Sequence, residues 1–253
     1  MKKIASILCL CLIVFSCHED KDDNITNTSI VFNFSHNWDG EEVSSSNFNT
    51  IQYTNANGEQ LSIEKLRYLI SRITFTNLNG EAYVLEGYNL VDVTNNSGLT
   101  FSSSTEIPFD TYTVSFVFGF NNDDNYQNYT DLNSESWNVP EALGGGYHYM
   151  QLEGKFIDNA SAEVGYAYHA IRAVDATEDE LEFTDTFIEV DLGEFELVNN
   201  VVFNVEMNIA EWFKSPNTWD LNELNNALMP NHDAQVMMFQ NGQNVFSLNS
   251  IEQ

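Results

Sequence analysis

The chain has few basic residues and very few cysteines. Nine Lys and Arg residues stand against 38 Asp and Glu, which gives a formal net charge of −29 at pH 7. Nucleic-acid partners are therefore excluded, because binding to phosphates requires a basic surface. All three cysteines lie within the first 17 residues. The rest of the chain has no thiol for a disulfide, a zinc–thiolate site or a cysteine nucleophile, so its stability must come from a core.

Long hydrophobic runs are also absent, and the longest, from Ile4 to Phe15, is too short to cross a bilayer as a helix. Lys2 and Lys3 precede it, and Ser16 and Cys17 follow. A positive start, a short apolar core and a small residue are typical of a secretion signal. The cysteine after the small residue indicates the lipoprotein form of that signal, in which Cys17 is acylated after cleavage.

The sequence thus predicts three parts: a signal peptide over residues 1–16, an acidic lipid-anchored tether over 17–29, and a single domain over 30–250. The acidic residues after Cys17 resemble the tag of lipoproteins that are moved to the outside of the outer membrane. We expect an outer-membrane lipoprotein that contacts the membrane through its anchor at Cys17. It would face the periplasm or be exposed at the cell surface.

Most of the chain after the tether is predicted to form consecutive β-strands. Apolar residues alternate with polar ones in runs rich in β-branched and aromatic residues, and Asn-Gly pairs at 57–58 and 79–80 mark turns. One region differs: residues 209–229, where Leu221, Leu224 and Leu228 recur at helical spacing before Pro230, predict a helix. The predicted fold is mostly β, an antiparallel β-sandwich with long loops and one or two short helices. The expected strands are 30–35, 66–75, 82–85, 88–93, 112–120, 147–156, 165–171, 187–192 and 201–209.

Motifs of catalysis are missing. The chain has no Gly-x-Ser-x-Gly, no phosphate-binding glycine loop and no His-Glu-x-x-His, so we expect no enzyme and no catalytic residues. The oxygen-rich stretch from Asn121 to Tyr126 lacks the spacing of an EF-hand, which favours a polar loop over a calcium site.

The histidines are few and therefore informative. His18 lies in the tether, whereas His36, His148, His169 and His232 each lie near a predicted strand end or in a loop. Neutral imidazole is the commonest protein ligand for copper and zinc, and imidazoles from separate strands can converge in a sandwich. An ordinary surface or core role remains open for each of them.

The aromatic residues allow a second class of function, a surface adhesion or glycan-binding module without metal. Alternating aromatics in strands belong mostly to a core. The four tryptophans fall instead in predicted loops or near the predicted helix, where an exposed ring could bind a sugar. They are Trp38, Trp137, Trp212 and Trp219.

Several segments together resemble the MbnP-like family, named for a copper-binding periplasmic protein associated with methanobactin. No single motif is specific, but the order of the segments is shared, from about Ile30 to Phe246. The matching segments are Val31–Gly40, Leu66–Ser71 (Leu-Arg-Tyr-Leu-Ile-Ser), Tyr88–Asp92, Phe116–Gly119 with the Asn-rich loop and Asp131-Leu132 after it, Gly146–Gly154, and a later strand that carries His169.

The resemblance implies a β-sandwich that binds copper outside the cytoplasm for uptake or handling. In related copper proteins two histidines and an oxidised tryptophan, kynurenine, bind the metal, and a di-haem peroxidase-like partner performs the oxidation. An outer-membrane importer is the other implied partner. The match carries over His169 as a copper ligand, and strand position adds His36 and His148.

The chain departs from the family at the tryptophan. Members often have a Met-x-Trp-x-Trp-like segment just before the Gly-Tyr, where this chain reads Val139 to Gly145 and has its nearest tryptophan at Trp137. Trp38, two residues from His36, shares a strand face with it and is the candidate for modification.

Overall fold

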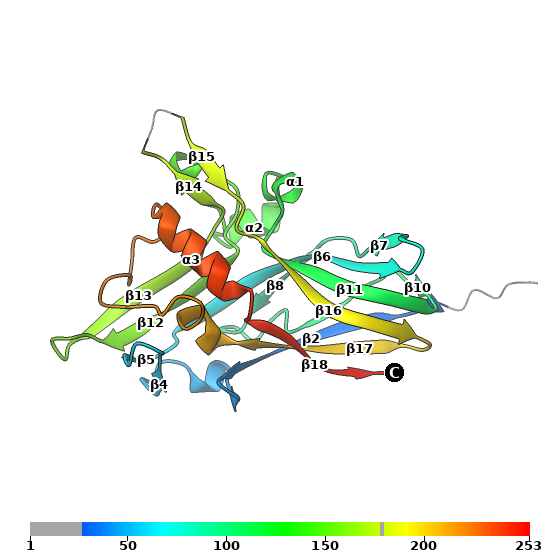
Figure 1. Ribbon diagram of the computed structural model, residues 1–253, viewed down its shortest axis with the longest axis horizontal. Coiled ribbons are helices and arrows are strands. Elements are labelled where there is room, and N and C mark those ends of the chain that lie inside the picture. The colour runs from blue at the N-terminus through cyan, green and yellow to red at the C-terminus, as the bar shows by residue number, and fades with distance from the viewer. Residues whose placement is uncertain (1–26, 178–179) are drawn as a thin grey trace, which may run out of the picture.

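Two β-sheets packed face to face form the molecule (Figure 1). The computed structural model describes residues 27–177 and 180–253. The predicted signal peptide and Cys17 lie outside the described residues. The first strand begins at Asn27, three residues before the expected start of the domain, and the predicted β-sandwich class is confirmed. No helix among the described residues has the length and apolar content needed to span a bilayer.

The larger sheet has nine strands. Its central strand, β6 (Lys65–Asn77), pairs with β11, β12, β7 and β8. The other members are β4 (Tyr53–Thr54), β5 (Gln60–Leu61), β7 (Ala82–Val84), β8 (Tyr88–Asp92), β11 (Asp110–Phe118), β12 (Met150–Ile157), β13 (Glu163–Ala170) and β16 (Ile188–Leu197).

The smaller sheet has five strands, β2 (Ile30–Trp38), β3 (Glu41–Glu42), β9 (Thr100–Ser102), β17 (Val201–Asn208) and β18 (Phe246–Glu252). Its central pair, β17 and β2, is parallel, so the last third of the chain lies beside its beginning. Two short ladders complete the β-structure, β1 (Asn27–Thr28) with β10 (Ile107–Pro108) and β14 (Ala173–Asp175) with β15 (Glu182–Thr184).

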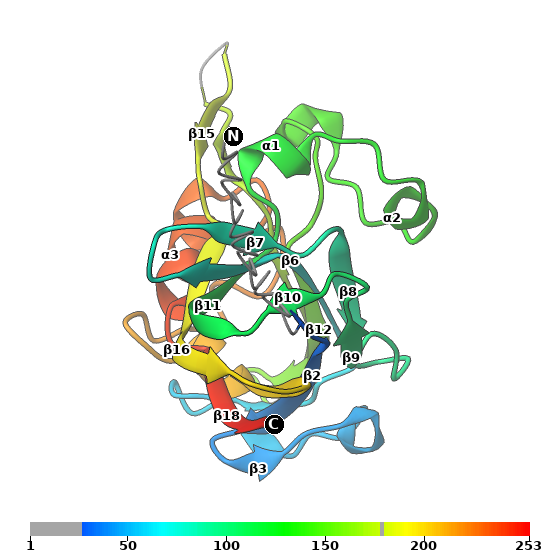
Figure 2. The ribbon, with the colours of Figure 1, turned by 90° about the vertical axis from the view of Figure 1, so that its right-hand side faces the viewer.

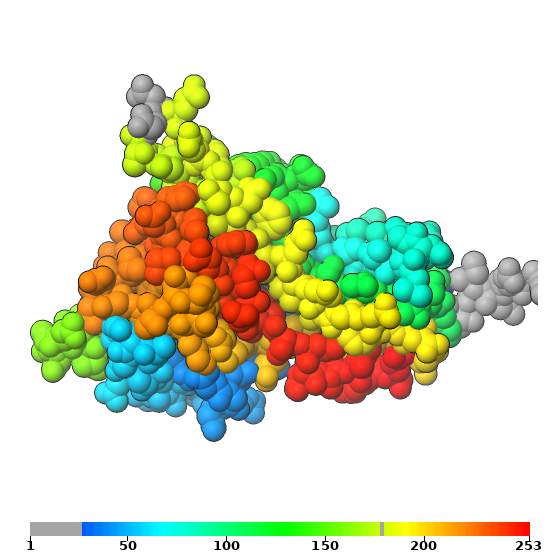
Figure 3. All heavy atoms as spheres, viewed as in Figure 1, coloured from blue at the N-terminus to red at the C-terminus, as the bar shows by residue number. Residues whose placement is uncertain are grey.

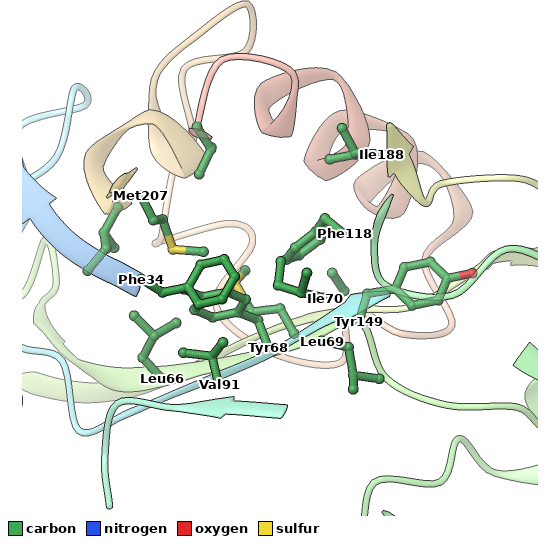
Figure 4. Packing of buried hydrophobic residues seen from close by; sticks show 14 of the residues in the cluster. Phe34, Leu66, Tyr68, Leu69, Ile70, Val91, Phe118, Tyr149, Ile188 and Met207 are labelled. Atoms are coloured by element: carbon green, nitrogen blue, oxygen red, sulfur yellow. The ribbon is translucent and has the colours of Figure 1, made fainter. Parts of the chain in front are cut away.

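Aromatic side chains fill the space between the sheets. Phe32 of the smaller sheet stacks on Phe203, with centroids 4.8 Å apart, and meets the edge of Phe75 from the larger sheet. Phe34 likewise contacts Tyr68, and Figure 4 shows both rings in this layer. The alternation seen in the sequence thus separates core from surface residues, and all nine predicted strands are present.

The helices are short and lie in the connections. They are the 3₁₀ turns η1 (Ser45–Asn47), η2 (Glu141–Leu143) and η3 (Ile209–Phe213) and the α-helices α1 (Asn122–Asn125), α2 (Thr130–Ser134) and α3 (His232–Gly242). In Figure 2, α2 and α3 lie on opposite sides of the molecule.

The predicted helix within 209–229 is wrong beyond η3, because α3 begins only after Pro230. Asn231 caps it, since its side chain accepts a hydrogen bond from the Ala234 N–H. Leu221 and Leu228 are buried as part of an irregular segment. This segment and α3 lie side by side on the left part of the face shown in Figure 3, in orange and red.

Candidate functional site

His148 and His169 come together on the outer face of the larger sheet. The β12–β13 ladder pairs His169 with Gln151, and the β6–β12 ladder pairs Gln151 with Arg67, so these three residues share one face. His148 lies just before β12, and its ring centroid is 5.2 Å from that of His169, in an edge-to-face arrangement. Hairpin pairing thus brings together two histidines that are 21 positions apart in the sequence.

Trp137 is the third member of this group. Its ring centroid lies 5.8 Å from that of His148, and the Arg67 guanidinium lies over the indole at 4.9 Å. Arg67 also donates hydrogen bonds to the side chain of Gln151 and the backbone carbonyl of Glu135. The loop after α2 is thereby held against the sheet.

The hydrogen bonds of His148 determine its tautomer. Its Nδ1 lies 2.9 Å from the carbonyl oxygen of Trp137, which can only accept, so Nδ1 carries the hydrogen. Burial lowers the pKa of His148 to about 4, and the ring is therefore neutral at pH 7. Nε2 is left with a free lone pair, which is the form of imidazole that binds metals.

His169 is hydrogen-bonded through its other ring nitrogen. Its Nε2 lies 2.9 Å from Oε1 of Glu153, which also accepts a hydrogen bond from Lys65 at 2.7 Å. The hydrogen bond from His169 holds the pKa of Glu153 at about 2, with a further lowering by Lys65, so the carboxylate is an acceptor at pH 7. Nδ1 is then the ring nitrogen of His169 that this bond leaves available. A carboxylate behind a metal-binding imidazole is a common way to orient the ring.

The other side of His169 is fixed by α3. Gln235 is 1% exposed; it donates to the His169 carbonyl at 2.8 Å and accepts from the Ile171 N–H at 2.8 Å. The end of β13 is thus tied to the helix that the sequence did not predict at this position.

Buried polar atoms without a partner gather at this group. Within residues 27–177 and 180–253, Nε2 of His148, Nε1 of Trp137 and Nε of Arg67 are all buried and make no hydrogen bond. Buried polar groups are almost always satisfied. Of these three atoms only Nε2 of His148 has a lone pair that can bind a metal, whereas the other two are N–H donors. The 5.2 Å centroid distance fits one ion between the rings, because a metal ~2 Å from a nitrogen of each ring places the centroids about 5–6 Å apart.

The donor set is small. The described part of the chain contains no group of three or more His, Cys, Asp or Glu side chains arranged to hold a metal. A metal at this group would therefore have two imidazole ligands, with any further ligand coming from a modified form of Trp137 or from outside the chain.

His36, the third predicted ligand, lies on the opposite face of the larger sheet. Its Nε2 is 2.9 Å from Oη of Tyr68 in the core. Tyr68 and Arg67 are neighbours in β6, so their side chains point to opposite faces of the sheet. His36 contacts Tyr68 on one face of β6, whereas the His148–His169 pair lies with Arg67 on the other face. The sheet therefore separates His36 from the pair.

Trp38, the predicted modified tryptophan, is also placed elsewhere, with its ring stacked on Tyr53 at 4.8 Å. The tryptophan beside the histidine pair is Trp137, which sequence reasoning noted but did not choose. Its position in a loop just before Gly146-Tyr147 was the available signal. Trp38, Trp137, Trp212 and Trp219 are all buried, so none of them is the exposed platform that the glycan-binding alternative required.

Comparison with known proteins identifies the family. The model of the MbnP family matches residues 27–237, and the chain belongs to this family. Among solved structures it is similar to MbnP from Methylosinus trichosporium, with 11% identity and a TM-score of 0.50, over 78% of this chain and 81% of that one. At this identity the likeness shows a shared fold. No curated protein matches the chain.

Proposed function

We propose that this MbnP-family protein binds one copper ion between His148 and His169 and serves in copper uptake or handling, without catalysis. The observation that carries the proposal is the buried, unpartnered Nε2 of His148 in a ring whose centroid lies 5.2 Å from that of His169. Neutral imidazole nitrogens suit copper well, and zinc less specifically.

The proposal revises the ligand set expected from the sequence. His148 Nε2 and His169 Nδ1 are the metal-binding atoms, and His36 is a core residue that binds Tyr68. The oxidised tryptophan implied by the family belongs at Trp137 rather than Trp38, because Trp137 lies beside the pair.

Export and anchoring complete the proposal. The lipoprotein signal and Cys17 lie before Asn27, the first described residue, and we propose that they attach the domain to the outer membrane. A di-haem peroxidase-like protein or an outer-membrane importer is the proposed partner. Such an arrangement would keep copper outside the cytoplasm, on a chain with no free thiol in its folded part.

Metal analysis and copper titration of the protein purified from an exporting host test the proposal. We expect one copper per chain, bound more tightly than micromolar, and a loss of about 100-fold or more in His148→Ala and in His169→Ala. His232→Ala is the matched control, since that ring is partly exposed and bonds Thr184. The absence of any site tighter than micromolar would disprove the proposal.

A further inference from the structure

A hollow in the surface, separate from the histidine pair, lies between α1, α2 and a run of three glycines. Its volume is 240 Å³. This is below the range of about 300–1,000 Å³ typical of pockets for drug-sized ligands, so it suits a smaller molecule. The hollow is lined by Asn125, Tyr126, Gln127, Asn128, Asn133, Asn138, Glu141, Gly144, Gly145, Gly146 and Tyr147.

One buried amide in this hollow has an unused donor. Asn125 is 1% exposed, and its Oδ1 accepts the Tyr147 N–H at 3.0 Å. That bond fixes which end of the amide is nitrogen. Nδ2 has no hydrogen-bond partner, and it lies against Gly146, where an added Cβ would be only 2.6 Å from it. An acceptor oxygen supplied by a ligand would satisfy this buried N–H₂.

The neighbouring amides are already held in place. Asn133 accepts hydrogen bonds from the Tyr147 hydroxyl at 2.9 Å and from Asn138 at 2.8 Å, and it donates to Asn128 at 2.8 Å. Amides offer both donors and acceptors, which matches the hydroxyl groups of a sugar. Orientation before binding also lowers the entropy cost of binding.

The charges of the hollow argue against ions. Glu141 is the one carboxylate among its lining residues, and neither Lys nor Arg is among them. The nearby Arg172 is already paired with Asp185 at 2.9 Å, so an anion finds no unpaired counter-charge among these residues. A cation would need oxygen ligands, whereas the unused group of Asn125 is a donor. The hollow therefore suits an uncharged, hydroxyl-rich molecule.

Two exposed aromatic rings stand at its rim. Tyr126 is 47% exposed and Phe183 is 37% exposed. The Arg172 guanidinium lies over both, at 6.0 Å and 4.7 Å from the ring centroids, and donates to the Tyr126 hydroxyl at 3.0 Å. The Phe183 ring packs on Gly144, where a side chain would collide with it. Exposed rings held in this way offer an apolar surface on which the C–H groups of a ligand can pack.

We propose that this hollow binds a neutral carbohydrate, about one sugar residue in size. The unpartnered amide of Asn125 and its oriented neighbours recognise hydroxyl groups, and Tyr126 stacks on the ring. This activity is independent of copper. It replaces the tryptophan platform expected from the sequence with a tyrosine at another place.

Saturation-transfer NMR on the full exported chain, freed of metal with a chelator, tests the proposal. The probes are glucose, galactose, mannose, fucose, xylose and N-acetylglucosamine. We expect at least one of them to bind with a Kd of about 1 mM or tighter. Failure of all six to bind at that level would overturn the proposal and leave the copper site unaffected.

Two variants locate the site. Tyr126→Ala removes the platform, and Asn125→Asp removes the donor while keeping an oxygen for the Tyr147 N–H. Each should weaken binding about tenfold or more, because a lost hydrogen bond in a site built for hydroxyls is costly. Phe109→Ala, an exposed ring elsewhere, and Asn159→Asp, an exposed residue that gains the same charge, should leave binding unchanged. Equal binding in all four variants would place the sugar elsewhere and overturn the proposal.

Discussion

The backbone carbonyl of Trp137 holds the ring of His148, with 2.9 Å between its oxygen and Nδ1. The same oxygen accepts the His148 backbone N–H at 2.9 Å. A loop residue and the residue that leads into β12 thus act as one unit. Nε2 of His148 carries a free lone pair because Nδ1 donates to a backbone carbonyl. A sequence motif of side chains does not reveal such a contact.

The carboxylate behind His169 should strengthen copper binding. Glu153→Gln keeps an acceptor but removes the charge that orients the ring, and we expect copper affinity to fall about 10- to 100-fold. Glu163→Gln is the matched control, because Glu163 pairs with Lys155 at 2.8 Å. Copper titration of the two variants measures the effect. An unchanged affinity in Glu153→Gln would exclude this role.

The stability of the metal-free protein should fall between pH 6.5 and pH 4. Burial lowers the pKa of His36 and of His148 to about 4 each, whereas the unfolded chain takes up these protons near pH 6.5. The unfolded state therefore binds more protons in this window, and acidification favours it, by up to about 3 kcal/mol for each histidine. Urea unfolding at a series of pH values measures the slope.

Replacing one of these histidines measures how much of the pH dependence of stability comes from that histidine and how much from other groups, such as carboxylates. His36→Phe removes a proton-binding group and the bond to Tyr68, so the variant should be less stable at pH 7 but have a flatter slope. A parent-like slope in His36→Phe would show that the His36 pKa is not lowered.

Trp137 should be the tryptophan that is modified in the native host. It lies beside His148, whereas Trp38 is packed between Tyr53 and Phe213. Conversion to kynurenine gains one oxygen and loses one carbon, so peptide mass spectrometry can locate it. We expect the change on the Trp137 peptide and its loss in His148→Ala. The same change on the Trp38 peptide would contradict this assignment.

Two glycines in neighbouring strands should respond very differently to a methyl group. An added Cβ at Gly154 would collide with the Ser62 carbonyl, which is backbone, whereas at Gly165 the nearest atom is 3.9 Å away. Gly154→Ala should cost about 1–3 kcal/mol or more, and Gly165→Ala should be close to neutral. Chemical denaturation measures both. Equal effects would show that β12 can move away from Ser62.

The strands were predictable because alternation and hairpin turns are local signals. The helix was not, since the spacing of Leu221, Leu224 and Leu228 serves an irregular segment in which Trp219 donates to the Leu224 carbonyl. A better local signal for α3 was Asn231, a capping residue directly after Pro230.

The candidate site was predictable only in part. His148 and His169 were named from strand position and family resemblance, but their meeting depends on the register of the β12–β13 hairpin. His36 was named for the same reasons and lies on the other side of the sheet. A single sequence does not show which of two faces a strand-end histidine occupies, nor that the loop carrying Trp137 folds back onto Arg67.

The parallel pairing of β2 with β17 sets the order in which this protein can be assembled. Asn33 and Asn204 bond across this pair although 171 positions separate them. Because the chain is synthesised from its N-terminus, β2 lacks this neighbour until about four-fifths of the residues have been made. Closing so long a loop is slow. The β2–β17 pairing must therefore be among the last parts of the fold to form, and the smaller sheet stays incomplete for most of the chain's synthesis.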